Sequence, residues 1–235
     1  MKMIKEILLL SDPALMPDLK AVLCEVNPKL KVTPIWSLEQ LVQRCLSPLK
    51  NTRMLSFGSD VIVPVEILQR LTCGAYNFHP GPPTYPGKFP SSFFLCDGGT
   101  RFGSTVHEMA TKVDSGPIVA VDWFNVAPET DCVTLNVASF RSLRGLFLKL
   151  APHLAKKAHP ISCVNEFWNG RTTTQQDFDE LCKLPQNVSE DEFMRRYRAV
   201  GEGPDHALEI VLHGHRFHLD NQHQAPEVLI GGKKR

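Results

Sequence analysis

Long apolar runs are absent from this sequence. The longest run near the amino terminus is Ile7-Leu8-Leu9-Leu10, far short of the roughly 20 residues that a membrane-spanning helix needs. The run is also too short for the hydrophobic region of a secretion signal, and Asp12 and Pro13 follow it without a cleavage pattern. We therefore expect neither a membrane segment nor a secretion signal.

An excess of charge of either sign is also lacking. The chain has 26 basic and 25 acidic residues among its 235, with 43% hydrophobic residues and a mean hydropathy of -0.14. These values are typical of a globular protein, and no global field attracts nucleic acid or an anionic membrane. The seven cysteines form no C-x-x-C motif and are widely spaced, which favours reduced thiols and a cytoplasmic location.

No G-x-G-x-x-G follows the first apolar segment, which disfavours a dinucleotide-binding dehydrogenase. Instead, strand-like and helix-like segments alternate along the first two-thirds of the chain. We expect strands over 4–10, 30–35, 53–57 and 74–79, separated by helices over 17–26, 37–45 and 64–71. This order predicts an α/β fold with a Rossmann-like, mostly parallel sheet flanked by helices.

The second half of the chain modifies this fold. Segments 103–109 and 117–126 read as a hairpin-like pair that would make the sheet mixed, and 130–157 reads as one or two helices. Beyond Gly170 the composition becomes polar, a capping motif opens a helix at Ser189, and 207–219 reads as a hairpin. We therefore predict a main domain over 1–170 and a small helix-plus-hairpin extension over 171–235, which could cover a ligand site of the main domain or mediate a homodimer.

Histidines cluster in that extension, at positions 213, 215, 218 and 223. Neither a cysteine nor a carboxylate completes a recognisable set of metal ligands around them. We interpret them as exposed strand histidines and predict no metal site.

Asn77 and His79 carry the first signal of chemistry. They are two residues apart in a predicted strand, so both side chains point to one face. They also lie at the carboxyl end of that strand, where open α/β sheets bind ligands. The prolines of the loop 80–87 restrict the backbone that follows. From spacing alone, a buried Asn and His satisfied by backbone hydrogen bonds remains an alternative.

The second signal is Gly103-Ser104-Thr105-Val106-His107, followed by Val113-Asp114-Ser115-Gly116. On its own, an Asp before Ser-Gly is commonly a turn residue. His107 could line a pocket, although core packing is the simpler interpretation.

Together, N-x-H at a strand end, G-x-T-V and V-D-S-G-P-I resemble the formyltransferase family that uses 10-formyltetrahydrofolate as formyl donor. The resemblance covers roughly residues 50 to 165 and includes the segment 62–68. It implies a folate-dependent formyltransferase with Asn77, His79 and Asp114 as the catalytic triad. Formyl transfer is an acyl transfer, for which an amide donor, an imidazole and a carboxylate are suitable groups.

The resemblance also implies where the folate binds. The pterin would lie against the backbone at Ile62 and Val63, and against the loop residues Ala110, Thr111 and Val113. For Ile62 and Val63, ordinary core packing is an open alternative.

Several differences between this sequence and the family limit which molecule can be the formyl acceptor. The loop 80–87 lacks the Ser and the basic residue that members often carry, and the segment 11–16 has no glycine that would let backbone N–H groups bind a phosphate. Glycinamide ribonucleotide is therefore disfavoured as the acceptor. tRNA is also disfavoured, because the charge of the chain is balanced and the basic insertion of the tRNA enzymes is missing. We expect a primary amine on a small molecule, with an amino sugar as one candidate. A formyltetrahydrofolate hydrolase of the same fold and a non-catalytic folate-binding module are the alternatives.

Overall fold

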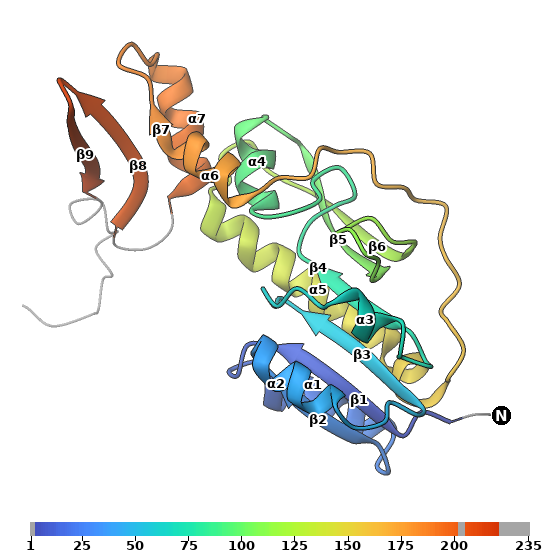
Figure 1. The fold of residues 1–235 in the computed structure, drawn as a ribbon. Coiled ribbons are helices and arrows are strands. Elements are labelled where there is room, and N and C mark those ends of the chain that lie inside the picture. The colour runs from blue at the N-terminus through green and yellow to red at the C-terminus, as the bar shows by residue number, and fades with distance from the viewer. Residues whose placement is uncertain (1–2, 202–204, 221–235) are drawn as a thin grey trace, which may run out of the picture.

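The computed structural model describes residues 3–201 and 205–220, and its main feature is a six-stranded sheet (Figure 1). The strand order is β2-β1-β3-β4-β5-β6. The strands are β1 (Glu6–Ser11), β2 (Lys31–Ile35), β3 (Thr52–Phe57), β4 (Ala75–His79), β5 (Arg101–Glu108) and β6 (Ile118–Asn125). The first four are parallel, whereas β5 pairs antiparallel with both β4 and β6. The predicted mixed, mostly parallel sheet is confirmed.

Helices cover both faces of this sheet. They are α1 (Met16–Val26), α2 (Leu38–Cys45), α3 (Val65–Leu68), α4 (Pro90–Cys96) and α5 (Cys132–Lys156). The Ser37 side chain accepts a hydrogen bond from Gln40 N and caps α2, as the sequence indicates. The predicted long helical region is the single helix α5, which continues through Pro152.

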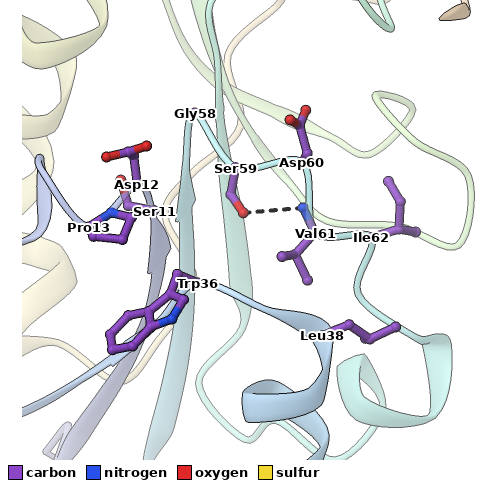
Figure 2. A pocket seen from close by; sticks show the side chains of 10 residues that line it. All are labelled: Ser11, Asp12, Pro13, Trp36, Leu38, Gly58, Ser59, Asp60, Val61 and Ile62. Carbon is purple, nitrogen blue, oxygen red and sulfur yellow. Dashed lines mark hydrogen bonds between the residues drawn. The ribbon is translucent and has the colours of Figure 1, made fainter.

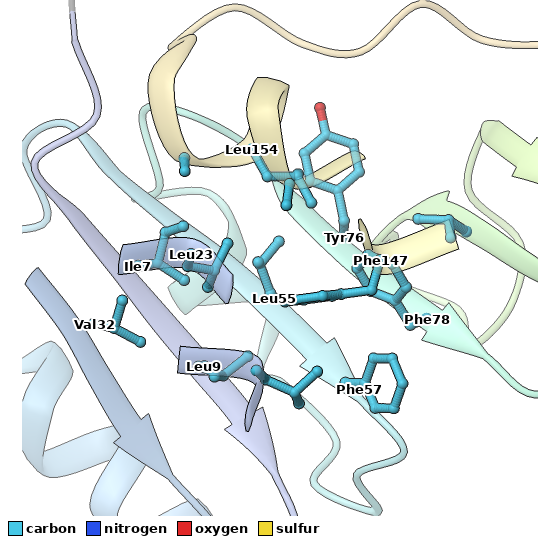
Figure 3. Packing of buried hydrophobic residues seen from close by; sticks show 14 of the residues in the cluster. Ile7, Leu9, Leu23, Val32, Leu55, Phe57, Tyr76, Phe78, Phe147 and Leu154 are labelled. Carbon is cyan, nitrogen blue, oxygen red and sulfur yellow. The ribbon is translucent and has the colours of Figure 1, made fainter. Parts of the chain in front are cut away.

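Two hydrophobic layers explain why β1 is apolar at every position from Ile7 to Leu10. Ile7 and Leu9 pack with α1 and α5 on one face, in the cluster that Figure 3 shows around Leu55 and Phe147. Leu8 and Leu10 pack on the other face with residues of α2 and α3. Because both faces of the strand are covered, its sequence shows no alternation of polar and apolar residues.

Arg53 of β3 is fully buried and ties the sheet to the end of α5. Its Nε donates to Cys73 O at 2.8 Å, its Nη1 to Leu154 O at 2.8 Å and its Nη2 to His159 O at 3.1 Å. A cation suits the carbonyl-rich carboxyl end of a helix. The guanidinium therefore fixes the point at which the chain leaves α5.

The chain beyond α5 forms a smaller unit. Its elements are α6 (Gln175–Cys182), β7 (Lys183–Leu184), α7 (Glu190–Val200), β8 (Asp205–Leu212) and β9 (His215–Asp220), with a sheet of order β7-β8-β9. The predicted hairpin is confirmed, and positive φ angles at His213 and Gly214 fit its two-residue turn. The polar segment that follows Gly170 includes a helix that was not predicted from the sequence, because Thr174 opens α6 with a capping box to Asp177.

This unit packs on α4 through a small apolar cluster that includes Cys96, Cys182 and Ala199. The division of the chain into domains near residue 170 stays a prediction. His213, His215 and His218 are exposed, as predicted, whereas His223 lies outside the described residues. Among the residues that the structure describes, no helix is both long and apolar enough to cross a membrane.

Candidate active site

β4 places the first two candidate side chains. Phe78 points into the core with 1% of its surface exposed, so Asn77 and His79 on either side of it share the opposite face. The chain then turns sharply, and a Cβ on Gly81 would lie 2.6 Å from His79 Nε2 and from Pro90 Cβ. Position 81 therefore requires glycine for the loop to pass this close to His79.

Asp114 reaches the same point from the loop between β5 and β6. Its φ of 45° lies in the left-handed region, which Asp tolerates better than most residues. Its side chain is buried: Oδ2 accepts a hydrogen bond from Gly87 N at 2.8 Å and lies 3.3 Å from His79 Nδ1. Oδ1 accepts from Asn77 Nδ2 at 3.4 Å. The structure thus brings Asn77, His79 and Asp114 together, although Asp114 follows His79 by 35 residues in the sequence.

His107 is a fourth member of this cluster. β4 and β5 pair so that His107 lies directly opposite Asn77. Its Nε2 is 3.1 Å from Asp114 Oδ1 and 3.2 Å from Asn77 Nδ2, and its Nδ1 faces the carbonyl of Glu108 at 2.8 Å. The interpretation of His107 as a core-packing residue is therefore incomplete: the ring is buried, but against polar groups of the cluster.

The two histidines hold the same relation to Asp114. His79 Nε2 faces the carbonyl of Tyr85 at 2.9 Å, just as His107 Nδ1 faces that of Glu108. A carbonyl is only an acceptor, so each of these ring nitrogens carries a proton. The remaining nitrogen of each ring faces the Asp114 carboxylate, and an additional proton on either ring would be shared with that carboxylate.

Burial and charge oppose one another at this cluster. Burial alone would raise the pKa of Asp114, but the nearby His79, the contact with His107 and the hydrogen bond from Gly87 N hold it at about 2. Burial lowers the pKa of His79 below its usual value, and the Asp114 carboxylate and the Tyr85 carbonyl counteract this effect. The cluster thus keeps an ionised carboxylate between two imidazoles at neutral pH.

The loop 80–88 is clamped from outside by the chain that follows α5. Thr173 N donates to Pro86 O at 2.9 Å, and Lys88 N donates to Thr173 O at 3.0 Å. Gly87 lies between these bonds with a φ of 96°, and a Cβ there would lie 2.2 Å from Thr173 O. The Gly87 N–H that binds Asp114 is therefore fixed by a contact between distant parts of the chain.

The five positions predicted for folate binding lie on two separate segments. Ile62 is exposed, so core packing is the wrong interpretation for this residue, whereas Val63 is partly buried against the cluster around Met54 and Ile67. Ala110, Thr111 and Val113 are all exposed in the loop that carries Asp114. Met109 N donates to Ala75 O at 2.9 Å, which joins the start of this loop to β4.

A cavity of about 530 Å³ lies at the carboxyl ends of β1, β2 and β3, and Ile62 forms part of its wall (Figure 2). Trp36 and the turn at Gly58 also line it. Asp12 in this wall accepts a hydrogen bond from Ala14 N at 2.7 Å, so a carboxylate already occupies the backbone donor of the β1–α1 turn. The cavity borders one predicted folate segment but none of the residues of the polar cluster lines it.

Within the two described ranges there is no group of three or more His, Cys, Asp or Glu side chains that could hold a metal ion. The polar cluster can instead donate hydrogen bonds through Asn77 and move protons between Asp114 and the two imidazoles. Asn77 is the half-buried member, whereas His79, His107 and Asp114 are buried. A reactant would therefore meet the Asn77 amide first.

Residues 28–142 match the model of a protein family described as formyl transferase. The fold is similar to that of a 4-N formyltransferase from Francisella tularensis, with 16% identity, a TM-score of 0.71, and coverage of 92% of this chain and 96% of that one. A sugar N-formyltransferase from Shewanella gives 17% identity, a TM-score of 0.71, and coverage of 92% and 96%. An N-formyltransferase from Helicobacter canadensis, solved with folinic acid and dTDP-3-aminofucose, has 17% sequence identity and a TM-score of 0.60, with coverage of 84% of this chain and 80% of that one.

Proposed function

We propose that this chain, whose residues 28–142 match the formyl transferase family model, moves a formyl group from 10-formyltetrahydrofolate to a primary amine of a small molecule. The observation that supports this most directly is the convergence of Asn77, His79 and Asp114 at the carboxyl end of β4. A fold alone requires none of these three polar groups at one buried point.

The reaction makes a bond between the acceptor nitrogen and the formyl carbon and breaks the bond from that carbon to N10 of the folate. Asn77 is placed to donate an N–H to the formyl oxygen as negative charge develops there. Such a donor contributes a factor of about 100 to 1,000 in acyl-transfer sites. Its own contacts, at 3.2 and 3.4 Å, both come from Nδ2, and their acceptors His107 Nε2 and Asp114 Oδ1 lie 3.1 Å apart. One N–H can therefore serve both acceptors and hold the amide in position, which leaves the other N–H for the formyl oxygen.

The same reaction moves one proton from the amine to N10. We assign this transfer to the Asp114–His79 pair. His79 presents no free nitrogen, because Nε2 faces Tyr85 O and Nδ1 faces Asp114. His79 therefore exchanges its proton through the Asp114 carboxylate, or directly when the contact with Tyr85 opens. His107, on the other carboxylate oxygen, offers a second position for that proton.

For the donor, we propose that the pterin lies against Ile62 and Val63 and against Ala110, Thr111 and Val113. The exposure of Ile62 and of the three loop residues leaves both backbone segments accessible, and both adjoin β4 or its neighbours. When bound, the folate supplies the formyl group, and the chain contributes orientation and the groups of the cluster.

For the acceptor, we propose an amino sugar. The Helicobacter protein of similar fold was solved with an aminofucose linked to a nucleotide, which supports an acceptor of this class. All seven cysteines lie in the described residues and none of them forms a disulfide bond there, which supports a cytoplasmic location for the reaction.

The test is turnover of 10-formyltetrahydrofolate with and without acceptor. We expect tetrahydrofolate to be released only when an amino sugar is present, together with a formylated product in the mass spectrum. Asn77→Ala and His79→Gln should each lower turnover about 100-fold. His153→Gln is the matched control, because His153 also directs a ring nitrogen at a backbone carbonyl, at 2.9 Å, but lies outside the cluster.

Release of formate without an amine would replace this proposal with a hydrolase. Binding of folate with no turnover for any amine would favour a binding module.

A further inference from the structure

The chain between α5 and α6 lies along the loops that border the cluster. We call residues 164–174 the strap; in Figure 1 the strap forms part of the gold segment that runs past β5 and β6. Val164 N donates to Ile118 O at 2.9 Å, and Asn169 N donates to Pro83 O at 3.2 Å. Gly170 passes so close to Thr84 that a Cβ would lie 1.8 Å from its carbonyl oxygen. The strap therefore holds both the β5–β6 region and the loop after His79.

Trp168 is the strap residue that reaches the cluster. Its ring lies edge-to-face against His107, with centroids 5.0 Å apart, and against His79, with centroids 5.7 Å apart. Its Nε1 donates to Gly116 O at 2.8 Å, two residues after Asp114. A single side chain thus contacts both imidazoles and the loop that carries the carboxylate between them.

We propose that Trp168 is a positioning residue for the cluster: its ring holds His79 and His107 and keeps water from them, and its N–H anchors the loop that carries Asp114. The catalytic consequence rests on the proposed function, whereas the positioning itself does not. Two features support the assignment. Edge-to-face contacts depend on ring orientation, so they restrict both imidazoles. The histidines are only 3% and 2% exposed with this indole in place.

A change at Trp168 should therefore alter the titration of His79. Burial is the largest cause of its lowered pKa, and the titratable groups that act on it are Asp114 and His107. Without the indole, water reaches the ring while both of these groups remain. The pKa of His79 should then move upward, toward its ordinary value.

The test uses ¹³C-labelled histidine and NMR titration of the full chain, with the His79 and His107 signals assigned by their loss in His79→Gln and His107→Gln. We expect Trp168→Ala to raise the titration midpoint of His79 and to shift the acidic limb of the kcat/KM profile in the same direction. Its kcat should fall about 10- to 100-fold, as for a misplaced catalytic group. Trp168→Phe keeps a ring but loses one hydrogen bond, so its kcat should fall only about 5-fold.

Trp123 supplies the matched control. Its Nε1 also bonds to the strap, at Glu166 Oε1 with a distance of 3.1 Å, but its ring lies under Arg101 rather than against a histidine. Trp123→Ala should loosen the strap without moving the His79 titration. An unchanged His79 midpoint in Trp168→Ala, or an equal shift in Trp123→Ala, would overturn the proposal.

If Trp168→Ala does not fold, Trp168→Leu takes its place, and Trp168→Phe remains the variant that keeps a ring. The NMR result stands whether or not the chain transfers formyl groups, so failure of the proposed function would leave it intact.

Discussion

Replacing Asp114 by Asn removes a charge from the cluster while keeping the size of the side chain. In Asp114→Asn, the amide oxygen can still accept from Gly87 N, and the amide NH₂ can donate to His107 Nε2. The loop anchor should therefore survive. What disappears is the negative charge that faces both imidazoles, together with the acceptor of the long hydrogen bond from Asn77 Nδ2.

The size of the effect on stability follows from the pKa of Asp114. Its fall from 3.8 to about 2 in the folded state corresponds to roughly 2 kcal/mol in favour of the folded, ionised form. This stabilisation is fully present above pH 3.8, the unfolded value, and is lost as the pH falls through about 2. Asp114→Asn should therefore lower the free energy of unfolding by about 2 kcal/mol at pH 7, and by less as the pH falls below 4.

Urea unfolding of both proteins at pH 7, 5, 4 and 3 measures this difference. Under the proposed function, turnover of Asp114→Asn should fall about 100-fold or more, since the variant cannot accept a proton from either histidine. Asp122→Asn is the control: Asp122 is an exposed strand residue that accepts one hydrogen bond, from Ser142 Oγ at 2.7 Å, and should change neither measurement.

A stability difference that stays constant from pH 7 to 3, or turnover within 10-fold of the wild type, would refute the reasoning about Asp114.

Two further substitutions test the surroundings of the cluster and the sheet. Gly87→Ala should lower the free energy of unfolding by at least ~2 kcal/mol and reduce turnover, because its Cβ would lie 2.2 Å from Thr173 O. Gly98→Ala is the control: Gly98 also has a positive φ, but nothing lies within 4 Å of its Cβ position, so the substitution should cost about 1 kcal/mol. Equal losses of stability for the two variants in a denaturant series would contradict the steric argument. Glu6→Gln should destabilise the chain at pH 7 and progressively less as the pH falls from 4.5 toward 2. Burial raises the pKa of Glu6, but the contacts with Arg44, Thr33 and Lys31 outweigh burial and hold this pKa at about 2. Thermal melting of both proteins at each pH checks this prediction, and a stability difference that does not depend on pH would exclude an ionic origin.

The sheet could be predicted because local signals agree with the fold along most of its length. The run from Ile7 to Leu10 is apolar at every position since both faces of β1 are covered, and Ser37 and Pro64 stand where helices begin. By contrast, α6 is a short polar helix and β7 has two residues. Neither carries a hydrophobic pattern long enough to separate it from a loop.

The cluster was only partly accessible to sequence reasoning. Asn77 and His79 share a face by their spacing, and Asp114 entered through the family resemblance. His107 could be recognised only by knowing that β5 pairs antiparallel with β4 in a register that sets it opposite Asn77. Trp168 and Thr173 act through tertiary contacts across about 60 to 90 residues, and no local pattern in the sequence reports such contacts.

The hydrogen bonds between Thr173 and the loop at Gly87 have a consequence for how this molecule matures. The sheet, α1 and α5 need only the chain up to about residue 156 to bury their shared interior. The backbone donor for Asp114 is secured by a segment that is synthesised later. A chain released before that segment has emerged could already hold its apolar core, but it would lack the hydrogen bonds of Thr173 that fix Gly87 N against the Asp114 carboxylate. Folding of the core and formation of the complete polar cluster should therefore be two separable events.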